Sequence, residues 1–583
     1  MCGIVGKVNL NNKIVENDEI QKMIDVIRHR GPDGNGIYIN ENIGFGHVLL
    51  KIQDLSNCSV QPYKYDNLVM AFNGEIYNYK ELKIELENKG YTFDTNGDTE
   101  VLIKYIHCFG IDETLKNIEG CYAICLLDNN NKDVYIIRDR FGIKPLYYTR
   151  NNEKLIFASE IKSIIQDESV ERKFDIETVL ISLNCKLWMD PKKTLFQNIY
   201  MLEPGNYIKI NSNYKIEVKK YYELKFKDEY KDPKKLVEDF SKEFTKSVKK
   251  KLISKVPVAA FLSGGLDSSL VCKILNDNMK QKLNTYTIHY DFDNDLDLNY
   301  ANQLKREEGF EQHNILITEK MYNIENIDKV TYSVEEILID KVYIPMYFNY
   351  KAAKDDGYTV VVSGQGSDEV WLGYVFTWKI FQYINQNIDK ATLINDYYIK
   401  NMVFKESINK KLKKSIVKTL ERYLDSNLDL NRDDIINSYA DMSMKTILHD
   451  LLMQEDKIAM ANSIESRVPF IDNHHIVELA YNASSNIKLY DGREKYIVRS
   501  FAKGKINNEI IEREKYPFPE PPSAYNNRIK QLCIENWEKI KKSKIINIII
   551  DADKLDDVDN FTPTEQWTML VYWRFEQVFE MSV

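Results

Sequence analysis

Several features that mark other classes of protein are missing from this sequence. The eight cysteines are scattered and form no CxxC pair, so we expect reduced, mostly buried thiols. The eight histidines show no metal-ligand spacing, and the adjacent pair His474 and His475 is more typical of a surface than of a zinc site. No apolar run is long enough for a membrane helix, and the first residues carry no positive leader. These absences predict a cytoplasmic protein with no membrane partner.

Charge is not concentrated in any part of the chain. The 79 basic and 88 acidic residues give a net charge of 79 − 88 = −9, and the two signs are interleaved. This distribution does not indicate a nucleic-acid partner. The 583 residues are too many for one ordinary core, and there is neither an internal repeat nor a low-complexity linker. We therefore expect two large domains or more.

The first two hundred residues alternate short apolar runs with turns, which predicts a mixed α+β fold with antiparallel pairing. Residues 69–72 are apolar, and the Asn73-Gly74 pair that follows predicts a strand ended by a tight turn. Residues 79–89 have helical periodicity. Residues 122–128 and 134–138 predict a hairpin.

The pattern changes after Tyr222, where an amphipathic helix is predicted over residues 235–250. Three apolar strands are predicted after it, at residues 256–262, 285–290 and 359–362. Strands that alternate with helices at this spacing predict a doubly wound parallel sheet. A polar helical stretch follows over residues 376–441, and its sequence indicates no function.

We place the domain boundary near residues 205–225. This divides the chain into an N-terminal domain of residues 1–210 and a C-terminal domain of residues 211–583.

Cys2 is the first residue that suggests chemistry. Removal of Met1 would leave a cysteine with a free α-amine, which can act as the general base for its own thiol. The apolar residues Ile4 and Val5 would hold this nucleophile on a strand. Taken alone, such a cysteine is more often an ordinary buried thiol.

Three further motifs accompany Cys2. They are Arg28-His29-Arg30-Gly31-Pro32-Asp33, Phe72-Asn73-Gly74-Glu75-Ile76-Tyr77-Asn78 and Gly97-Asp98-Thr99-Glu100. Together they resemble the class II glutamine amidotransferases, whose N-terminal-nucleophile fold is an αββα sandwich. The resemblance implies that Cys2 attacks the side-chain amide of glutamine.

The same resemblance implies a glutamine-binding site. Asn73 and the N–H of Gly74 would form the oxyanion hole, because both donate to the developing negative charge. Glu75 and Asp98 would hold the α-amino end of glutamine, since carboxylates complement an ammonium group. Ile52 is a further implied glutamine-binding position.

One position departs from the family pattern. The family usually places an arginine two residues after the histidine that matches His47, where it grips the α-carboxylate of glutamine, and here that position is Leu49. Loss of this clamp should weaken glutamine binding by roughly 1.5–3 kcal/mol if nothing replaces it. Lys51 and Arg30 are the two candidate replacements.

A loop after the first strand of the second half suggests a nucleotide site. It reads Ser263-Gly264-Gly265-Leu266-Asp267-Ser268-Ser269. Glycines permit a tight turn, and the turn delivers N–H groups to an anion at the start of a helix. Asp267 suits a magnesium ion better than a phosphate. Two glycines alone would fit any strand–turn–helix corner, so the prediction depends on the whole string.

This string resembles the pyrophosphate-binding loop of the adenine-nucleotide α-hydrolase group, which has a Rossmann-like parallel sheet. The resemblance implies that ATP is cleaved between its α and β phosphates, giving an acyl-adenylate. A second loop, Ser363-Gly364-Gln365-Gly366-Ser367-Asp368-Glu369, matches the same site. It implies that Asp368 joins Asp267 as a magnesium ligand. The implied nucleotide contacts are Phe261, Ser263, Gly264, Gly265, Ser268, Ile288, Ser363 and Gly364.

Two further segments resemble the asparagine synthetase domain, a Rossmann-like α/β domain with helical additions. The first is Asp456-Lys457 with the run from Met460 to Asp472, and the second is Gly492-Arg493-Glu494-Lys495. The resemblance implies that Lys495 stabilises charge on the α-phosphate during adenylation and amide formation. Outside such a segment, a lysine is usually just solvated.

Gln365 is the second departure. Asparagine synthetases usually carry a glutamate here, which is implicated in the acyl-adenylate and ammonia steps. Glutamine keeps the shape and the hydrogen bonds of glutamate but cannot accept a proton. The acceptor carboxylate is therefore not fixed as aspartate.

The resemblance implies a homodimeric ligase that uses glutamine, ATP and magnesium and passes ammonia between its domains. Asparagine synthesis from aspartate is the leading hypothesis. The alternative is the same chemistry on another carboxylate, such as a sugar uronate of a surface polysaccharide or a carboxylate of a peptide or natural product. A degenerate non-catalytic homologue is disfavoured by the intact Cys2, Asp267, Asp368 and Lys495. A ring-closing enzyme without glutamine is disfavoured by Cys2, Asn73 and Asp98.

Overall fold

The computed structural model describes most of the chain. The described ranges are residues 2–56, 60–185, 190–291, 295–374, 402–404, 407–427, 435–514 and 521–583. Much of the helical stretch predicted over residues 376–441 lies outside them. Its described part contains α15 (Lys410–Asn427) and the start of α16 (Ile435–Lys445), which confirms the helical prediction for these residues.

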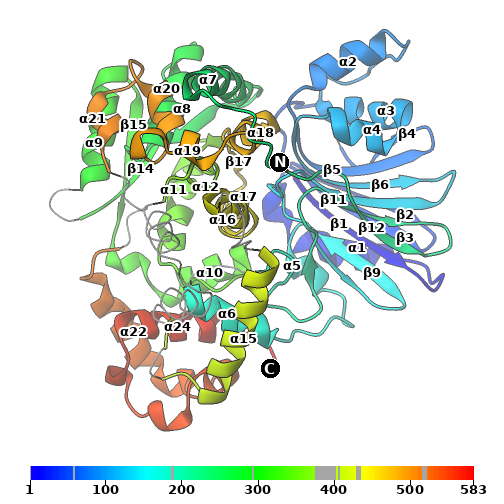
Figure 1. The fold of residues 1–583 in the computed structure, drawn as a ribbon. Coiled ribbons are helices and arrows are strands. Elements are labelled where there is room, and N and C mark those ends of the chain that lie inside the picture. Colours follow the sequence, from blue (N-terminus) through cyan, green and yellow to red (C-terminus); the bar gives the residue numbers. More distant parts are fainter. Residues whose placement is uncertain are drawn as a thin grey trace.

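Two antiparallel sheets face each other in the N-terminal half, drawn in blue and cyan in Figure 1. The first sheet has the order β10 (Tyr200–Met201), β8 (Tyr147–Arg150), β9 (Lys154–Ala158), β1 (Cys2–Asn9), β3 (Ile43–Leu49) and β2 (Gly34–Asn40). The second has the order β12 (Ile216–Lys220), β11 (Asn206–Ile210), β7 (Asp133–Arg138), β6 (Gly120–Asp128), β5 (Leu68–Ile76) and β4 (Tyr63–Tyr65). The predicted hairpin is confirmed as β6 and β7.

The two sheets form the middle layers of a four-layer sandwich. Side chains such as Phe45, Ala123 and Phe157 fill the space between the sheets, because alternate residues of each strand point to that side. Helices α1 (Asn17–Asp25) and α5 (Ile161–Ile164) cover the first sheet, and α2 (Tyr79–Glu87), α3 (Asp98–Phe109) and α4 (Ile111–Asn117) lie with the second. The predicted αββα sandwich is thus present.

The tight turn predicted at Asn73-Gly74 is wrong. Strand β5 continues through both residues to Ile76, and Gly74 pairs with Tyr122 of β6. A Cβ atom on Gly74 would lie 2.1 Å from the backbone oxygen of Cys121. The glycine therefore serves the close approach of two strands rather than a turn.

A five-stranded parallel sheet organises the second half. Its order is β15 (Glu311–Ile317), β14 (Asn284–Tyr290), β13 (Val258–Phe261), β16 (Val360–Val362) and β17 (Glu465–Arg467). The three predicted strands are confirmed as β13, β14 and β16, whereas β15 and β17 were not predicted. The order reverses between β13 and β16, and such a switch point is where ligands bind in doubly wound sheets.

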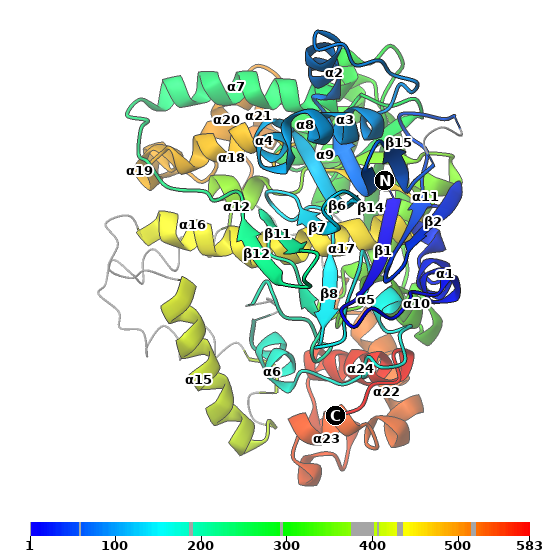
Figure 2. The ribbon, with the colours of Figure 1, turned by 90° about the vertical axis from the view of Figure 1, so that its right-hand side faces the viewer.

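Helices surround this parallel sheet. They include α7 (Pro233–Lys250), α8 (Leu266–Asn278), α9 (Leu296–Glu308), α10 (Ile324–Val334), α11 (Tyr343–Asp355), α12 (Ser367–Trp371), α17 (Ile447–Ala461), α18 (His474–Tyr481), α19 (Ser485–Lys488), α20 (Tyr496–Ala502) and α21 (Asn508–Glu512). The predicted amphipathic helix is α7. In Figures 1 and 2, α17 lies at the junction of the two halves.

A C-terminal helical group joins the two halves from below. It contains α22 (Tyr525–Ile540), α23 (Lys544–Ile549) and α24 (Pro563–Val578), which form the red group at the lower left of Figure 1. Phe174 and Phe196, near α6 (Ile176–Cys185), pack against Phe575 of α24. One apolar core therefore includes side chains from both halves. Among the described residues, no helix is long and apolar enough to cross a membrane.

Candidate functional site

Cys2 occupies the first position of β1, as its predicted role requires. Its backbone nitrogen donates to Oδ1 of Asn73 at 2.9 Å, and both residues are buried. The side-chain nitrogen Nδ2 of Asn73 is buried and has no hydrogen-bond partner within the described ranges. A buried donor without an acceptor is unfavourable. The position of this donor beside Cys2 fits its predicted role, which is to donate to an oxyanion formed during the reaction.

A small cavity of about 50 Å³ opens beside Cys2. Four of the predicted glutamine-site residues line it: Cys2, Ile52, Glu75 and Asp98. Burial, together with the charge of Glu465, raises the pKa of Asp98 to about 6. Burial and the charges of Glu465 and Asp98 likewise hold the pKa of Glu75 well above its usual value. A bound ammonium group would relieve this repulsion between carboxylates.

Leu49 lies beside Cys2. It pairs with Cys2 across β1 and β3 and lines the cavity. Arg30, one of the two candidate replacements, does not line the cavity, because its donors are engaged behind Cys2. Lys51 does line the cavity and remains the candidate cation.

Arg30 instead connects the two halves of the molecule. The guanidinium is fully buried and donates to the carbonyl of Cys2 at 3.0 Å, to Glu160 at 2.9 Å and to Asp456 of α17 at 2.8 Å. Ser463, at the end of α17, donates to the carbonyl of His29 at 2.6 Å. Arg30, which belongs to the motif of residues 28–33 in the first half, therefore binds Asp456, which begins a motif of the second half.

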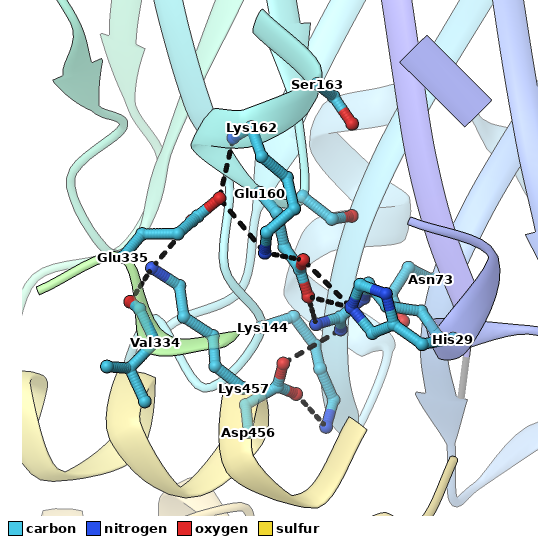
Figure 3. Close-up of polar contacts among 12 residues, drawn as sticks. His29, Asn73, Lys144, Glu160, Lys162, Ser163, Val334, Glu335, Asp456 and Lys457 are labelled. Carbon is cyan, nitrogen blue, oxygen red and sulfur yellow. Dashed lines mark hydrogen bonds and ion pairs between the residues drawn. The ribbon is translucent and has the colours of Figure 1, made fainter. Parts of the chain in front are cut away.

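Further buried charges extend this contact, as Figure 3 shows. Glu160 accepts hydrogen bonds from His29 and Lys162, and Asp456 lies 3.5 Å from the ammonium of Lys144. Glu335 pairs with Lys162 at 3.1 Å and with Lys457 of α17 at 3.0 Å. We name these residues the junction network: His29, Arg30, Lys144, Glu160, Lys162, Glu335, Asp456 and Lys457.

The two predicted nucleotide loops lie side by side at the switch point of the parallel sheet. Ser367 of the second loop donates to Oδ1 of Asp267 in the first at 2.7 Å. A Cβ atom on Gly364 would lie 3.0 Å from the backbone nitrogen of Ser268. Gly264 has a φ of +67°, and a Cβ there would lie 2.5 Å from the Asp297 carbonyl. Glycine thus permits both the curvature and the close packing of the loops.

Lys495 reaches this point from the start of α20. Its buried ammonium lies 2.5 Å from Oδ2 of Asp267 and 2.6 Å from Oδ1 of Asp368. The two carboxylates therefore converge on one cation, which is the arrangement that a divalent ion with oxygen ligands requires. Lys495 also has a φ of +53°, an uncommon value for a lysine that the surrounding structure must impose.

A cavity of about 850 Å³ opens over these loops. The predicted residues that line it are Phe261, Ser263, Gly265, Asp267, Ser268, Ile288, Ser363, Gly364, Gln365, Asp368 and Lys495. Gly264, which was also predicted as a nucleotide contact, does not line the cavity. Arg513, which pairs with Asp297 at 2.5 Å, and the acids Asp450 and Glu455 of α17 also line the cavity and were not predicted.

Comparison with known sequences agrees with this arrangement. Residues 1–222 match a glutamine amidotransferase domain, and residues 239–573 match the family described as asparagine synthase. The chain belongs to the asparagine synthase family.

Individual proteins also match along almost the whole chain. The Bacillus subtilis protein named asparagine synthetase [glutamine-hydrolyzing] 1 is 31% identical over 98% of this chain and 96% of its own length. A second B. subtilis protein, asparagine synthetase [glutamine-hydrolyzing] 3, is 26% identical over 96% of this chain and 93% of its own. The protein named amidase chyE of Penicillium rubens is 28% identical over 93% of each chain. Glutamine-dependent amidotransferase chemistry follows from this family, and ATP use is implied by it.

The junction network predicts a strong dependence of stability on Glu160. Burial raises the pKa of this carboxyl, but His29, Lys162 and Arg30 outweigh burial and hold the pKa well below its usual value. Glu160→Gln removes a buried negative charge and leaves its cationic partners uncompensated, so we expect a loss of about 3–5 kcal/mol in the free energy of unfolding. Urea denaturation measures this loss. Glu113→Gln, which breaks the exposed pair with Lys116, is the control and should change little. Equal losses in both variants would contradict a structural role for the network.

The cavity beside Cys2 yields a prediction for glutamine use. If Lys51 supplies the charge that Leu49 lacks, Lys51→Ala should raise the KM for glutamine roughly tenfold or more. Amidation with ammonium should be unchanged, because it does not use this cavity. Steady-state kinetics with both nitrogen sources measure the difference, with Lys51→Arg expected to retain glutamine use and the exposed Lys89→Ala as control. An unchanged KM in Lys51→Ala would rule this lysine out.

Proposed function

We propose that this protein is a glutamine-dependent amidotransferase that activates a carboxylate with ATP and magnesium and converts it to an amide. Aspartate is the leading acceptor, which would give asparagine. The observation that carries the proposal is the Lys495 ammonium held between Asp267 and Asp368, where two loops meet at the switch point of the sheet. The second site beside Cys2 would supply the nitrogen.

In the proposed glutaminase step, Cys2 acts after removal of Met1. Burial raises the pKa of the Cys2 thiol, so the proton must be taken as the sulfur attacks the glutamine amide. The freed α-amine would accept it. Asn73 Nδ2 and the N–H of Gly74 would donate to the oxyanion. Asp98 and Glu75 would bind the α-ammonium of glutamine.

In the proposed synthetase step, the turn after β13 would present its N–H groups to the phosphates of ATP. Asp267 and Asp368 would hold magnesium, which neutralises phosphate charge when bound. Lys495 would then be released from these carboxylates to the α-phosphate, where negative charge develops as the acceptor carboxylate attacks. The acceptor carboxylate displaces pyrophosphate, and ammonia then displaces AMP to form the amide.

A larger acceptor is the second candidate. Gln365 stands where asparagine synthetases usually carry glutamate, and the cavity wall beyond the loops bears the apolar side chains of Ile337, Ile339 and Met346. Such a wall fits an acceptor with an apolar body. The similarity to a protein named amidase is compatible with this candidate.

A product assay separates the two candidates. Purified protein is incubated with ATP, magnesium, glutamine and either aspartate or a panel of uronates and peptide carboxylates, and products are identified by mass spectrometry. We expect formation of an amide together with AMP and pyrophosphate, and we expect aspartate to be the carboxylate that is converted. Cys2→Ala should lose synthesis from glutamine and keep synthesis from ammonium.

Amide formation with another carboxylate, and none with aspartate, would select the second candidate. No pyrophosphate with any carboxylate would contradict the proposed function.

A further inference from the structure

Asp450 is a buried carboxylate that the proposed mechanism does not yet use. It lies in the first turn of α17, and its Oδ2 accepts a hydrogen bond from Gln454 one turn later at 2.7 Å. Its Oδ1 is buried and receives no hydrogen bond from an N–H or hydroxyl donor in the described part of the chain. The group that shares a hydrogen bond with Asp450 is another carboxyl, that of Glu336. A buried oxygen without a donor is unfavourable, which points to a proton or ligand that this oxygen binds during turnover.

The surroundings of Asp450 favour a bound proton. Burial, the negative charge of Glu336 and a hydrogen bond with Glu336 raise the pKa of Asp450 well above its usual value, and Gln454 and Lys457 oppose this shift. Tyr343, whose own pKa is raised by burial and by the charges of Asp450, Glu336 and Asp340, packs nearby. Two carboxyl groups this close share a proton, as in other carboxyl pairs. Such a pair takes up and releases protons as one unit.

Asp450 also lies between two cavities. It lines the large cavity above the nucleotide loops and a second cavity of about 20 Å³ at the junction of the two halves. Tyr147, Ile161 and Leu195 of the first half line the second cavity. This volume holds about one water-sized molecule, and ammonia has that size.

One face of α17 connects Asp450 with the loop that carries Gln365. Ile447, Asp450, Leu451, Gln454 and Glu455 of α17 all line the large cavity. Glu455 follows Asp450 by five residues, about 7.5 Å along the helix axis. Glu455 bonds Ser363, the residue that begins the Gln365 loop. Asp450 and Gln365 therefore line the same cavity, and α17 connects them through Glu455 and Ser363.

Amide formation requires a proton acceptor in this cavity. When ammonia attacks the acyl-adenylate, a C–N bond forms, the bond from the acyl carbon to the phosphate oxygen of AMP breaks, and the nitrogen loses one proton. Gln365 cannot take that proton. Asp267 and Asp368 are paired with Lys495, and Asp297 and Glu494 are paired with arginines.

We propose that Asp450 accepts the proton that the attacking ammonia loses, in place of the carboxylate that Gln365 lacks. This role rests on the proposed function. The proton enters the pair of Asp450 and Glu336 and returns to water when the amide leaves.

The test compares Asp450→Asn with the double variant Asp450→Asn/Gln365→Glu. In the single variant we expect amide formation from both glutamine and ammonium to fall about 100-fold or more. Glutamine hydrolysis and ATP–pyrophosphate exchange should stay near the wild-type rates, because neither needs this proton acceptor. The glutamate of the double variant should restore a substantial part of amide formation. Asp450→Glu is the conservative control and should keep activity.

The pH dependence gives a second measurement that does not need Asp450 to be replaced. Amide formation should decline at acid pH as the pair with Glu336 becomes fully protonated. Gln454→Leu removes the hydrogen bond that lowers the pKa of Asp450, so this decline should move to higher pH.

Three results would each overturn the role of Asp450. The acid decline in amide formation could stay at the same pH in Gln454→Leu, the rate of amide formation could be undiminished in Asp450→Asn, or Gln365→Glu could fail to restore amide formation in the double variant. Absence of pyrophosphate exchange in the wild-type protein with every carboxylate would overturn the proposed function and this role with it.

Discussion

The buried guanidinium of Arg30 is the contact on which the relation between the two halves depends. It binds the carbonyl of the proposed nucleophile Cys2, the carboxylate of Glu160 and the carboxylate of Asp456 in α17. A buried arginine is unfavourable unless every donor is paired, so these three partners cannot move independently. Helix α17 also presents Asp450 and Glu455 to the large cavity. The same helix is therefore held by Arg30 beside Cys2 and forms part of the wall of the cavity over the nucleotide loops.

A single strand separates the glutamine cavity from the nucleotide loops. Arg467 of β17 lies 3.7 Å from Glu75, a residue of the glutamine cavity. Strand β17 pairs with β16, which ends at the loop that carries Ser363 and Gln365. The contact of both sites with β17 suits a nitrogen that must remain uncharged, since ammonia becomes ammonium in bulk water at neutral pH and ammonium is not a nucleophile. The contacts at the junction of the two halves hold the glutamine cavity and the nucleotide loops close to the same strand.

Most of the architecture could be predicted because its signals are local. The loop from Ser263 to Ser269 and the loop from Ser363 to Glu369 are continuous strings after apolar strands. Strand β15 was not predicted because its first four residues are polar and nearly all of its residues are exposed or half-buried. The turn prediction at Asn73-Gly74 was wrong because a glycine can serve strand packing as well as a turn. Asp450 and Glu336 are far apart in sequence and meet only in the fold, so no motif could reveal them.

The most direct test of the central claim, that nitrogen passes from Cys2 to the synthetase cavity through the junction, follows the nitrogen atom itself. Glutamine labelled with ¹⁵N in its amide is supplied together with unlabelled ammonium, and the isotope content of the product amide is read by mass spectrometry. The ammonium is kept below the concentration at which it supports amide formation without glutamine, but well above the amount of ammonia that glutamine releases. Direct passage predicts that the product retains most of the ¹⁵N despite the unlabelled pool. A product with the isotope ratio of the bulk ammonium would show that the nitrogen leaves the protein between the two sites, which would contradict the claim.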